Sequence, residues 1–364
     1  MKHVAMARKA IVVRLAIKLS FMQKPNKVIY GQNGAALIFI VLILALSVTT
    51  YLVTNLQGLG LKAMRQDKTM LALQEAKAVL IGSSLMSSTM PGALPCPDAT
   101  NSGVKGACSA SNYIGRFPWK TLGFGDTRDG STECLWYAIS PVFRDTVATS
   151  SRNAANAINS NTPGTITIKD ASGAIVASGV IAVIISPGSA FSGQSRMGSG
   201  AQVCSGNNVA SNYLDSLSGI NNATGNISGN NLTFISTQET SSFNDRLIYV
   251  TQEDLYKPLR KRIVREIMGK VEIPAGLYKY YQINTSNYPC PANSAISGQN
   301  CTLSSGFVPY PDTNGSLWTW LKNNGWFNLT IYNYVSSTKV SISVGGGAGL
   351  VKNCTANLSN VSCD

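Results

Sequence analysis

The most constraining feature of this sequence is an uncharged apolar run from Ala35 to Thr54. The run contains no Asp, Glu, Lys, Arg, Gly or Pro. About 18 or more consecutive apolar residues are long enough to cross a bilayer. Seven Lys or Arg residues and no acidic residue precede it, and positive charge beside a span keeps that end in the cytoplasm. We therefore predict a transmembrane half over residues 35–57, with the rest of the chain exported.

The chain can continue as a helix well beyond this run. No proline lies between Ala35 and Pro91, so a single helix over residues 35–88 is predicted, about 80 Å long at 1.5 Å per residue. Gly58 and Gly60 lie where its two halves join, and glycine has low helix propensity. The second half carries an amphipathic stripe that suits a globular domain, made of Leu61, Met64, Lys68, Leu71, Gln74 or Glu75, Ala78 and Leu85.

Composition excludes several function classes. Only 13% of the residues are charged, against about 25% in typical soluble domains. The net charge of +13 depends on the first 34 residues, and without them 23 basic and 17 acidic residues remain. This weakens a nucleic-acid interpretation. The one histidine is His3, so histidine-based catalysis or metal binding is excluded from the rest of the chain.

The head of the protein contains an internal duplication. Leu94–Cys108 (LPCPDATNSGVKGAC) matches Tyr288–Cys301 (YPCPANSAISGQNC). Each match follows a candidate amphipathic helix and precedes a Gly-aromatic-Pro stretch, an aromatic strand and an apolar strand. We call Pro95–Cys108 the first PCP loop and Pro289–Cys301 the second PCP loop. A period near 190 residues indicates duplicated domains and not a solenoid.

The duplication reduces the choice of disulfide pairings. All eight cysteines follow the apolar run, which indicates disulfides in an oxidising compartment. Eight cysteines allow 105 pairings. If the two units share a fold, each PCP loop closes its own bridge and the other cysteines pair within their units. The predicted bridges are Cys96–Cys108, Cys290–Cys301, Cys134–Cys204 and Cys354–Cys363.

These patterns predict an α+β fold. A long N-terminal helix, with a membrane half and an amphipathic half, is followed by two duplicated units of one helix and an antiparallel sheet. The predicted divisions are a basic leader 1–34, the helix 35–88, a first head unit 89–250 and a second head unit 251–364. The first unit adds the strand candidates TITIKD, NLTFISTQ and DRLIYVTQ.

The N-terminal region resembles the type IV filament family, which comprises type IV pilins and type II secretion pseudopilins. The resemblance is carried by Gly34-Ala35-Ala36-Leu37-Ile38-Phe39-Ile40 and covers about 55 residues. It implies that a prepilin peptidase cuts after Gly34 and methylates Ala35. If Met22 is the true start, the leader has 13 residues, closer to the family's habit than a start at Met1.

One departure from the family pattern concerns the fifth mature residue. Most members carry a Glu there, which pairs with a neighbour's N-terminal amine inside the filament. Here that residue is Phe39, and cleavage after Gly31 would place Ala36 at the same position. A lone carboxylate in lipid is costly, so the family keeps it where an amine is available. A subunit without it resembles the large tip pseudopilin and certain non-core pilins.

Four groups of residues could carry chemistry. Asp126, Asp129 and Glu133 offer oxygen ligands for calcium, which the tip pseudopilins also bind. A basic stripe consists of Arg260, Lys261, Arg262 and Arg265. It could contact phosphates, as in DNA-binding minor pilins, or it is a solvated helix face. Trp318, Trp320 and Trp326 could form an adhesive patch or belong to the core. Ser186–Arg196 holds serines near an arginine but lacks a nucleophile elbow and a histidine base.

The sequence therefore predicts a minor or tip subunit of a type IV pilus or pseudopilus, without enzymatic activity and without a required cofactor. Its predicted partners are other pilin-like subunits, reached through the N-terminal helix, a prepilin peptidase and the bacterial inner membrane. The head would lie in the periplasm and later at the cell surface. Two alternatives stay open: a single-pass envelope protein that binds a partner outside any filament, and a DNA-uptake minor pilin.

Overall fold

The computed structural model describes residues 33–88, 90–108, 113–146, 151–153, 155–198, 204, 206–269, 276–310, 318–345, 354–357 and 360–363. Side chains are described throughout these ranges except at residues 33–37, 52–59 and 354–363. The predicted leader falls outside the described residues as far as residue 32. The chain divides into two compact units, Met1–Gly60 and Leu61–Asp364.

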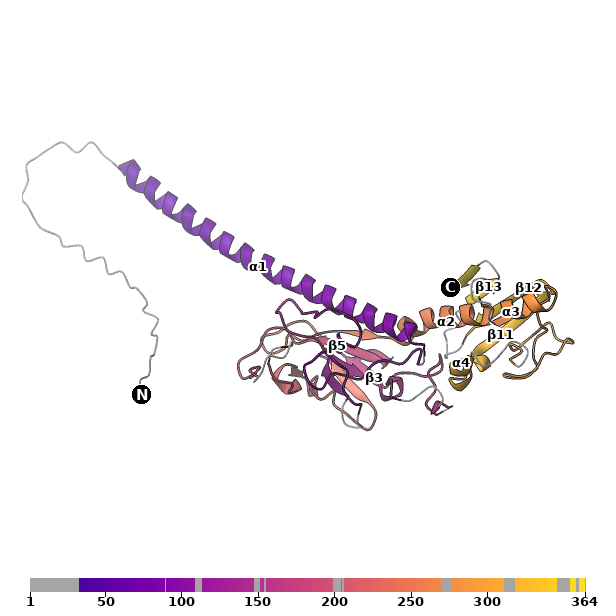
Figure 1. Ribbon diagram of the computed structural model, residues 1–364. Coiled ribbons are helices and arrows are strands. Elements are labelled where there is room, and N and C mark those ends of the chain that lie inside the picture. Colours follow the sequence, from indigo (N-terminus) through magenta and orange to yellow (C-terminus); the bar gives the residue numbers. More distant parts are fainter. Residues whose placement is uncertain are drawn as a thin grey trace, which may run out of the picture. The chain divides into compact units, whose positions relative to one another are not determined.

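Helix α1 spans Asn33–Met86 (Figure 1). In the first unit, every side chain from Ile38 to Tyr51 is exposed, and the large apolar ones show between 52% and 69% of their surface. Within the described part of the chain, no helix is both long enough and apolar enough to cross a membrane. The predicted transmembrane half over residues 35–57 is corrected on this finding: the part of the run with described side chains, residues 38–51, is 14 residues long, and a span needs about 18 or more.

In the second unit, α1 packs through a face of mostly small side chains. Its buried residues are Thr69, Ala72, Leu73, Ala76, Leu80 and Ser84. Alanines let the helix backbone approach its neighbours closely, while Leu73 and Leu80 fill the core. Most of the predicted stripe faces the other way, since Leu61, Met64 and Leu71 are 59%, 69% and 56% exposed, and Leu85 is half-buried against the core. The expectation was wrong for most of the stripe because two sets of apolar residues follow the helical spacing. Met64 and Leu71 belong to the exposed set, and Leu73 and Leu80 belong to the buried set.

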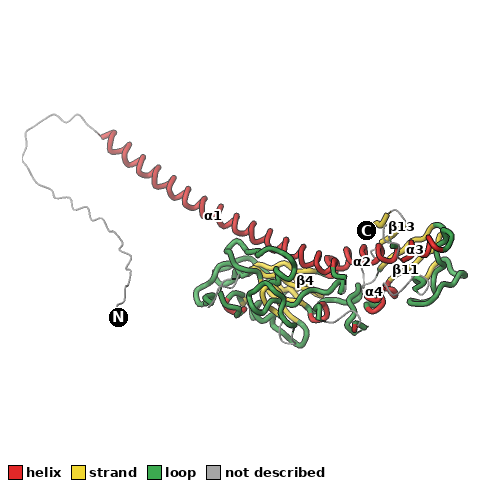
Figure 2. The backbone as a smooth tube through the Cα atoms, in the orientation of Figure 1, coloured by secondary structure: helices red, strands yellow, loops and turns green. Residues whose placement is uncertain are grey.

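The strands drawn yellow around β4 in Figure 2 include an antiparallel four-stranded sheet of the second unit. Its strands follow the order β1 (Ile114–Arg116), β2 (Trp136–Ile139), β5 (Ala182–Ser186) and β9 (Arg246–Val250). Side chains alternate between its faces. Tyr137, Ile139 and Ile184 pack with the buried leucines of α1, whereas Trp136, Ala138 and Val183 enter a separate core on the other face.

That separate core is closed by a second, smaller sheet. It is ordered β4 (Ile175–Val180), β3 (Ile166–Lys169) and β8 (Leu232–Ile235), and β3 pairs with β8 in parallel. A short hairpin, β6 (Ser216–Leu217) and β7 (Ile220–Asn221), and two 3₁₀ turns, η1 (Pro141–Phe143) and η3 (Ala210–Asn212), complete this region. The three additional predicted strands correspond to β3, β8 and β9.

The remaining residues build a helix-on-sheet arrangement. It contains α2 (Gln252–Met268), α3 (Gly276–Ile283), α4 (Thr319–Asn323) and the 3₁₀ helix η6 (Trp326–Leu329). One sheet is ordered β10 (Ser305–Gly306), β11 (Thr330–Ser336) and β12 (Lys339–Val344). β13 (Cys354–Asn357) and β14 (Asn360–Cys363) form a hairpin. α2 begins at a capping box in which Thr251 and Asp254 bond reciprocally.

The predicted fold class is corrected in two further respects. The first head unit is not one antiparallel sheet, because the parallel β3–β8 pair joins segments far apart in the sequence, which local patterns do not reveal. The two head units also share one hydrophobic core, which contains Leu73, Tyr137, Ile263 and Tyr332. The predicted boundary at residues 250 and 251 therefore falls between β9 and α2 and does not separate two cores.

Candidate functional site

Three disulfides join described cysteines, and all three were predicted. They are Cys96–Cys108, Cys134–Cys204 and Cys290–Cys301, with Cα–Cα distances of 5.4, 5.8 and 4.9 Å. These separations lie within the usual disulfide range. Cys354 and Cys363 face each other in the β13–β14 register, but their side chains lie outside the described residues. That fourth bridge stays a prediction.

The first PCP loop is organised around a buried aspartate. Asp98 is fully buried, and its Oδ1 accepts hydrogen bonds from the backbone N–H and the hydroxyl of Thr100. Its Oδ2 accepts a third bond, from the Gly103 N–H, at 2.7 Å. The backbone of Asp98 also pairs with Arg116 on β1 through two bonds of 2.8 Å. A carboxylate satisfied by several donors can be buried, so Asp98 fixes the shape of the loop.

Arg116 links this loop to distant segments. Its Nε donates to Asn101 Oδ1 at 3.2 Å, and its Nη1 donates to the Cys134 carbonyl at 3.0 Å. The guanidinium lies over the rings of Trp136 and Tyr213, with Cζ 4.3 and 4.0 Å from the ring centroids. Burial lowers the pKa of Arg116 to about 10, so it stays charged at neutral pH. Among the described residues Arg116 makes no direct ion pair, and aromatic stacking compensates its buried charge.

The second PCP loop uses the same backbone arrangement with neutral side chains. Ala292 pairs with Phe307 through two backbone bonds of 2.8 and 2.9 Å, as Asp98 does with Arg116. In both loops the carbonyl of the second proline accepts a late N–H, from Gly106 to Pro97 and from Asn300 to Pro291. The two duplicated segments therefore share local geometry although their buried chemistry differs.

The three predicted calcium ligands each have protein partners. Asp129 is fully buried and accepts hydrogen bonds from Ser131 N, Glu133 N, Ser186 Oγ and Gly188 N. Asp126 pairs with Arg128, and Glu133 pairs with Arg196 at 3.1 Å. Among the described residues these three carboxylates do not form a common set of ligands. Hydrogen bonds and ion pairs of these carboxylates therefore stabilise a turn.

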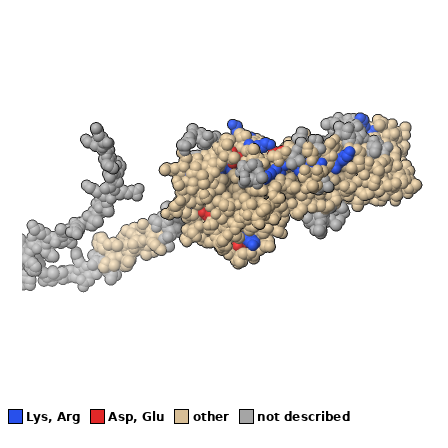
Figure 3. Space-filling view, turned by 90° about the horizontal axis from the view of Figure 1, so that it is seen from below, with Lys and Arg blue, Asp and Glu red and all other residues tan. Residues whose placement is uncertain are grey.

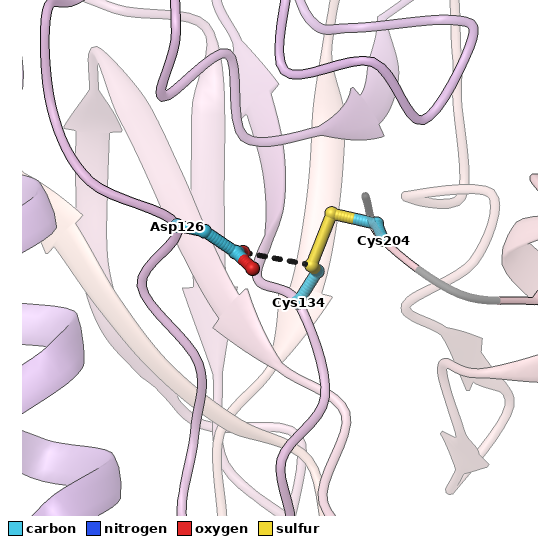
Figure 4. Close-up of side chains that lie close together, drawn as sticks. All are labelled: Asp126, Cys134 and Cys204. Atoms are coloured by element: carbon cyan, nitrogen blue, oxygen red, sulfur yellow. Dashed lines mark hydrogen bonds between the residues drawn. A yellow bond between two sulfur atoms is a disulfide. The ribbon is translucent and has the colours of Figure 1, made fainter. Parts of the chain in front are cut away.

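One described group does bring three ligand atoms within 4.8 Å: Asp126, Cys134 and Cys204 (Figure 4). The Oδ1 of Asp126 lies 3.4 Å from the Cys134 sulfur. Both sulfurs are bonded to each other in the disulfide, and metal binding requires thiolates. The oxidised protein therefore presents a carboxylate against a disulfide at this point, and not a metal site.

The predicted basic stripe on α2 is largely used internally. Arg260 is 2% exposed and pairs with Glu253 at 3.2 Å. Arg262 pairs with Glu266, donates to the Ser87 carbonyl and stacks over Trp320. Of the four predicted residues, Lys261 is half-buried and Arg265 exposed. Figure 3 shows a mostly uncharged face on which the visible Lys and Arg side chains lie mainly toward one edge.

Two other predicted surfaces are also internal. Trp318, Trp320 and Trp326 are at most 5% exposed, so the predicted adhesive patch is wrong and the core alternative holds. Trp318 packs against Phe327 and Tyr310, Trp326 lies edge-on to Tyr256, and the Trp320 N–H donates to Glu266. In the Ser186–Arg196 loop, Arg196 donates to the Gly188 carbonyl at 2.7 Å and to the Asn212 carbonyl at 3.1 Å. That arginine closes the loop.

A buried acidic pair was not predicted from the sequence. Asp245 is 2% exposed, and its Oδ2 accepts bonds from Asp215 N and Asn222 Nδ2. Its Oδ1 has no hydrogen-bond partner among the described residues. Burial, followed by the nearby Asp215 charge, raises the pKa of Asp245 to about 8. No sequence signal marked these residues, because Asp in a polar loop is an ordinary turn residue.

Comparison with known proteins identifies no relative. No family model, no curated protein and no solved structure matches the chain.

Proposed function

We propose that the protein is a minor subunit of a type IV pilin-like filament, placed at or near the end of a pilus or of a type II secretion pseudopilus. Before assembly the subunit is held at the bacterial inner membrane with its globular part in the periplasm. Its partners are other pilin-like subunits, which contact its N-terminal helix, and a prepilin peptidase, which removes the leader. Three disulfides agree with export to an oxidising compartment.

The observation that carries this proposal is the uncovered apolar surface of α1. From Ile38 to Tyr51 the helix has no charged residue, and each of its large apolar side chains is more than half exposed. A contiguous apolar surface of this kind marks an interaction site. In a filament of pilin type, the corresponding helices of neighbouring subunits cover one another. Phe39, 68% exposed, would then meet a neighbour without offering a carboxylate.

The first test concerns processing. We expect N-terminal sequencing of the envelope-extracted protein to find a chain that begins at Ala35 and carries an N-methyl group. Gly34→Leu should block the cut, while Gly31→Leu serves as the control that distinguishes the two cleavage registers. A mature chain that begins at Met1 or Met22 in the presence of the peptidase would contradict the proposal and favour an envelope protein outside any filament.

The second test concerns position. Immunogold labelling of the head should place gold at filament ends, and Phe39→Glu should not improve assembly if the subunit has no neighbour above it to pair with. Gold spread evenly along filaments would contradict the end position. Gold confined to the cell envelope would contradict filament membership. We do not extend the proposal to DNA uptake, because Arg260 and Arg262 have internal partners.

A further inference from the structure

The three described disulfides differ in how accessible their sulfurs are. Cys96, Cys134 and Cys204 are 1%, 4% and 1% exposed. In the second PCP loop, Cys301 is exposed and Cys290 is half-buried. Thiol–disulfide exchange requires a thiolate to reach one sulfur along the axis of the bond, so access limits its rate. Exposure alone therefore ranks the Cys290–Cys301 bridge as the most reactive of the three.

The bridges also differ in their electrostatic surroundings. The Oδ1 of Asp145 lies 3.6 Å from Cys96 Sγ, while its Oδ2 pairs with Lys105. The Oδ1 of Asp126 lies 3.4 Å from Cys134 Sγ, while its Oδ2 pairs with Arg128. Neither sulfur of Cys290–Cys301 contacts a carboxylate among the hydrogen-bonded groups of the described residues. The sequence between Cys290 and Cys301, PANSAISGQN, carries no charge, whereas the first PCP loop holds Asp98 and Lys105.

A carboxylate against a sulfur opposes exchange in two ways. It repels the attacking thiolate, and it destabilises the leaving sulfur, which carries negative charge when the bond breaks. In the first PCP loop, attack on the partly exposed Cys108 would expel Cys96 as a buried thiolate beside Asp145. In the second PCP loop, attack on Cys301 expels Cys290, which is half-buried and whose backbone N–H is bonded to the neutral amide of Gln299.

We propose that Cys301 is a thiol-modification site, at which small thiolates open the second PCP loop while the other two bridges stay closed. A thiolate attacks Cys301 Sγ, a mixed disulfide forms there, and the Cys290–Cys301 bond breaks. The electron pair leaves with Cys290 Sγ, which takes a proton from water. A second thiolate can then attack the mixed disulfide, releasing Cys301 as a thiol and the small molecule as its own disulfide. The inference is independent of the proposed filament role.

The experiment is a timed exposure of the full, folded chain to glutathione, with acid quench, alkylation of free thiols and non-reducing peptide mapping. We expect Cys290–Cys301 to open about tenfold or more faster than either other bridge. The first adduct should carry glutathione on Cys301 and a free thiol on Cys290. Opening of Cys96–Cys108 or Cys134–Cys204 at the same rate, or a first adduct on Cys290, would overturn the proposal.

Two near-isosteric variants separate charge from exposure. Gln299→Glu places a carboxylate beside Cys290 and should slow opening of the second PCP loop severalfold. Asp145→Asn removes the carboxylate from Cys96 and should speed opening of the first PCP loop, which stays slower than the second because Cys96 is buried. Far-UV circular dichroism and Tm check that each variant is folded. Should neither variant change its loop's rate, the electrostatic part of the inference is refuted.

The charge of the thiol supplies an independent measurement. Cysteamine carries a positive amine, whereas glutathione is negatively charged at neutral pH. The rate ratio between the two PCP loops should be smaller with cysteamine, because the Asp145 oxygen that faces Cys96 is not the one paired with Lys105 and attracts that thiol while it repels glutathione. A ratio that is the same for both thiols, and insensitive to salt, would contradict a role for the carboxylate.

Discussion

The first PCP loop closes over an aspartate and an arginine, whereas the second closes over an alanine and a phenylalanine. In both, the residue after the second proline pairs with the residue after a glycine, Gly115 or Gly306, on the next strand. Each glycine also stands opposite a buried tyrosine, Tyr137 or Tyr332. The backbone arrangement is therefore kept while the side chains inside it change from charged to neutral.

The difference extends beyond the loops. Buried carboxylates occur at Asp98, Asp129, Asp215 and Asp245, and among the described residues none occurs after residue 250. The first region (residues 89–250) thus relies on buried carboxyl groups and their hydrogen-bond partners, and the second region (residues 251–364) relies mainly on aromatic and aliphatic packing. Buried polar networks specify geometry closely but are costly when one member is lost. Mutations in the first region should therefore have larger and more pH-dependent effects than matched mutations in the second.

The largest expected effect comes from Arg116→Lys. Lysine keeps the charge but loses the planar fork and its stacking on Trp136 and Tyr213, so we expect a loss of about 3 kcal/mol in the free energy of unfolding. The matched change in the second region, Phe307→Ala, should cost about 1–2 kcal/mol because Phe307 is half-buried. Urea unfolding measures both. A smaller cost for Arg116→Lys than for Phe307→Ala would reverse the comparison.

The second-largest expected loss of unfolding free energy should be equal in the two PCP loops. A Cβ at Gly115 would lie 2.5 Å from the Asp98 carbonyl oxygen, and one at Gly306 would lie 2.5 Å from that of Ala292. Because backbone atoms cannot move aside cheaply, each Gly→Ala change should cost about 2 kcal/mol. Gly125→Ala, where a Cβ has no neighbour within 4 Å, is the control. Clearly unequal costs at Gly115 and Gly306 would mean that the two loops are not structurally equivalent.

A third effect depends on pH and belongs to the first region. Because the folded pKa of Asp245 is about 8, against 3.8 in the unfolded chain, the folded state holds a proton that the unfolded state releases. Its contribution therefore destabilises the fold progressively as pH rises from about 4 to 8. Asp245→Asn removes this dependence. We expect the variant to equal wild type near pH 4 and to exceed it by about 1–2 kcal/mol at pH 8, after discounting for relaxation around the charge.

The measurement is the difference between wild-type and Asp245→Asn unfolding free energies across that pH range. Taking the difference cancels the contribution of every group whose pKa is the same in both proteins. Asp170→Asn is the control: a hydrogen bond from the Ser172 side chain lowers the pKa of Asp170, so this variant should show no loss of wild-type stability between pH 4 and 8. A difference that shrinks as pH rises would contradict the assignment of a raised pKa.

Much of this architecture could be predicted from sequence because it rests on local signals. The β2, β5, β11 and β12 strands are short apolar or aromatic runs, and three disulfides followed from cysteine positions repeated in both loops. The inward face of α1 could not be predicted, because Ala72 and Ala76 are weak apolar signals beside Met64 and Leu71. The parallel β3–β8 pair joins residues more than sixty positions apart, and the burial of Arg260 depends on Glu253 and the packing around α2.

The smallest effect tests the two matched tyrosines. The hydroxyl of Tyr332 donates to the Pro289 carbonyl at 2.8 Å, whereas that of Tyr137 is buried with no hydrogen-bond partner among the described residues. Burial raises the pKa of both, so both are neutral at ordinary pH.

Tyr332→Phe leaves the Pro289 carbonyl unsatisfied and should cost about 1 kcal/mol. Tyr137→Phe removes an unsatisfied hydroxyl and should be neutral or stabilise by up to about 1 kcal/mol. Each variant removes only one oxygen, so packing is nearly unchanged and the two form a matched pair. If Tyr137→Phe proved the more costly of the two, the Tyr137 hydroxyl would have to bond a buried water, and the loops would be equally satisfied.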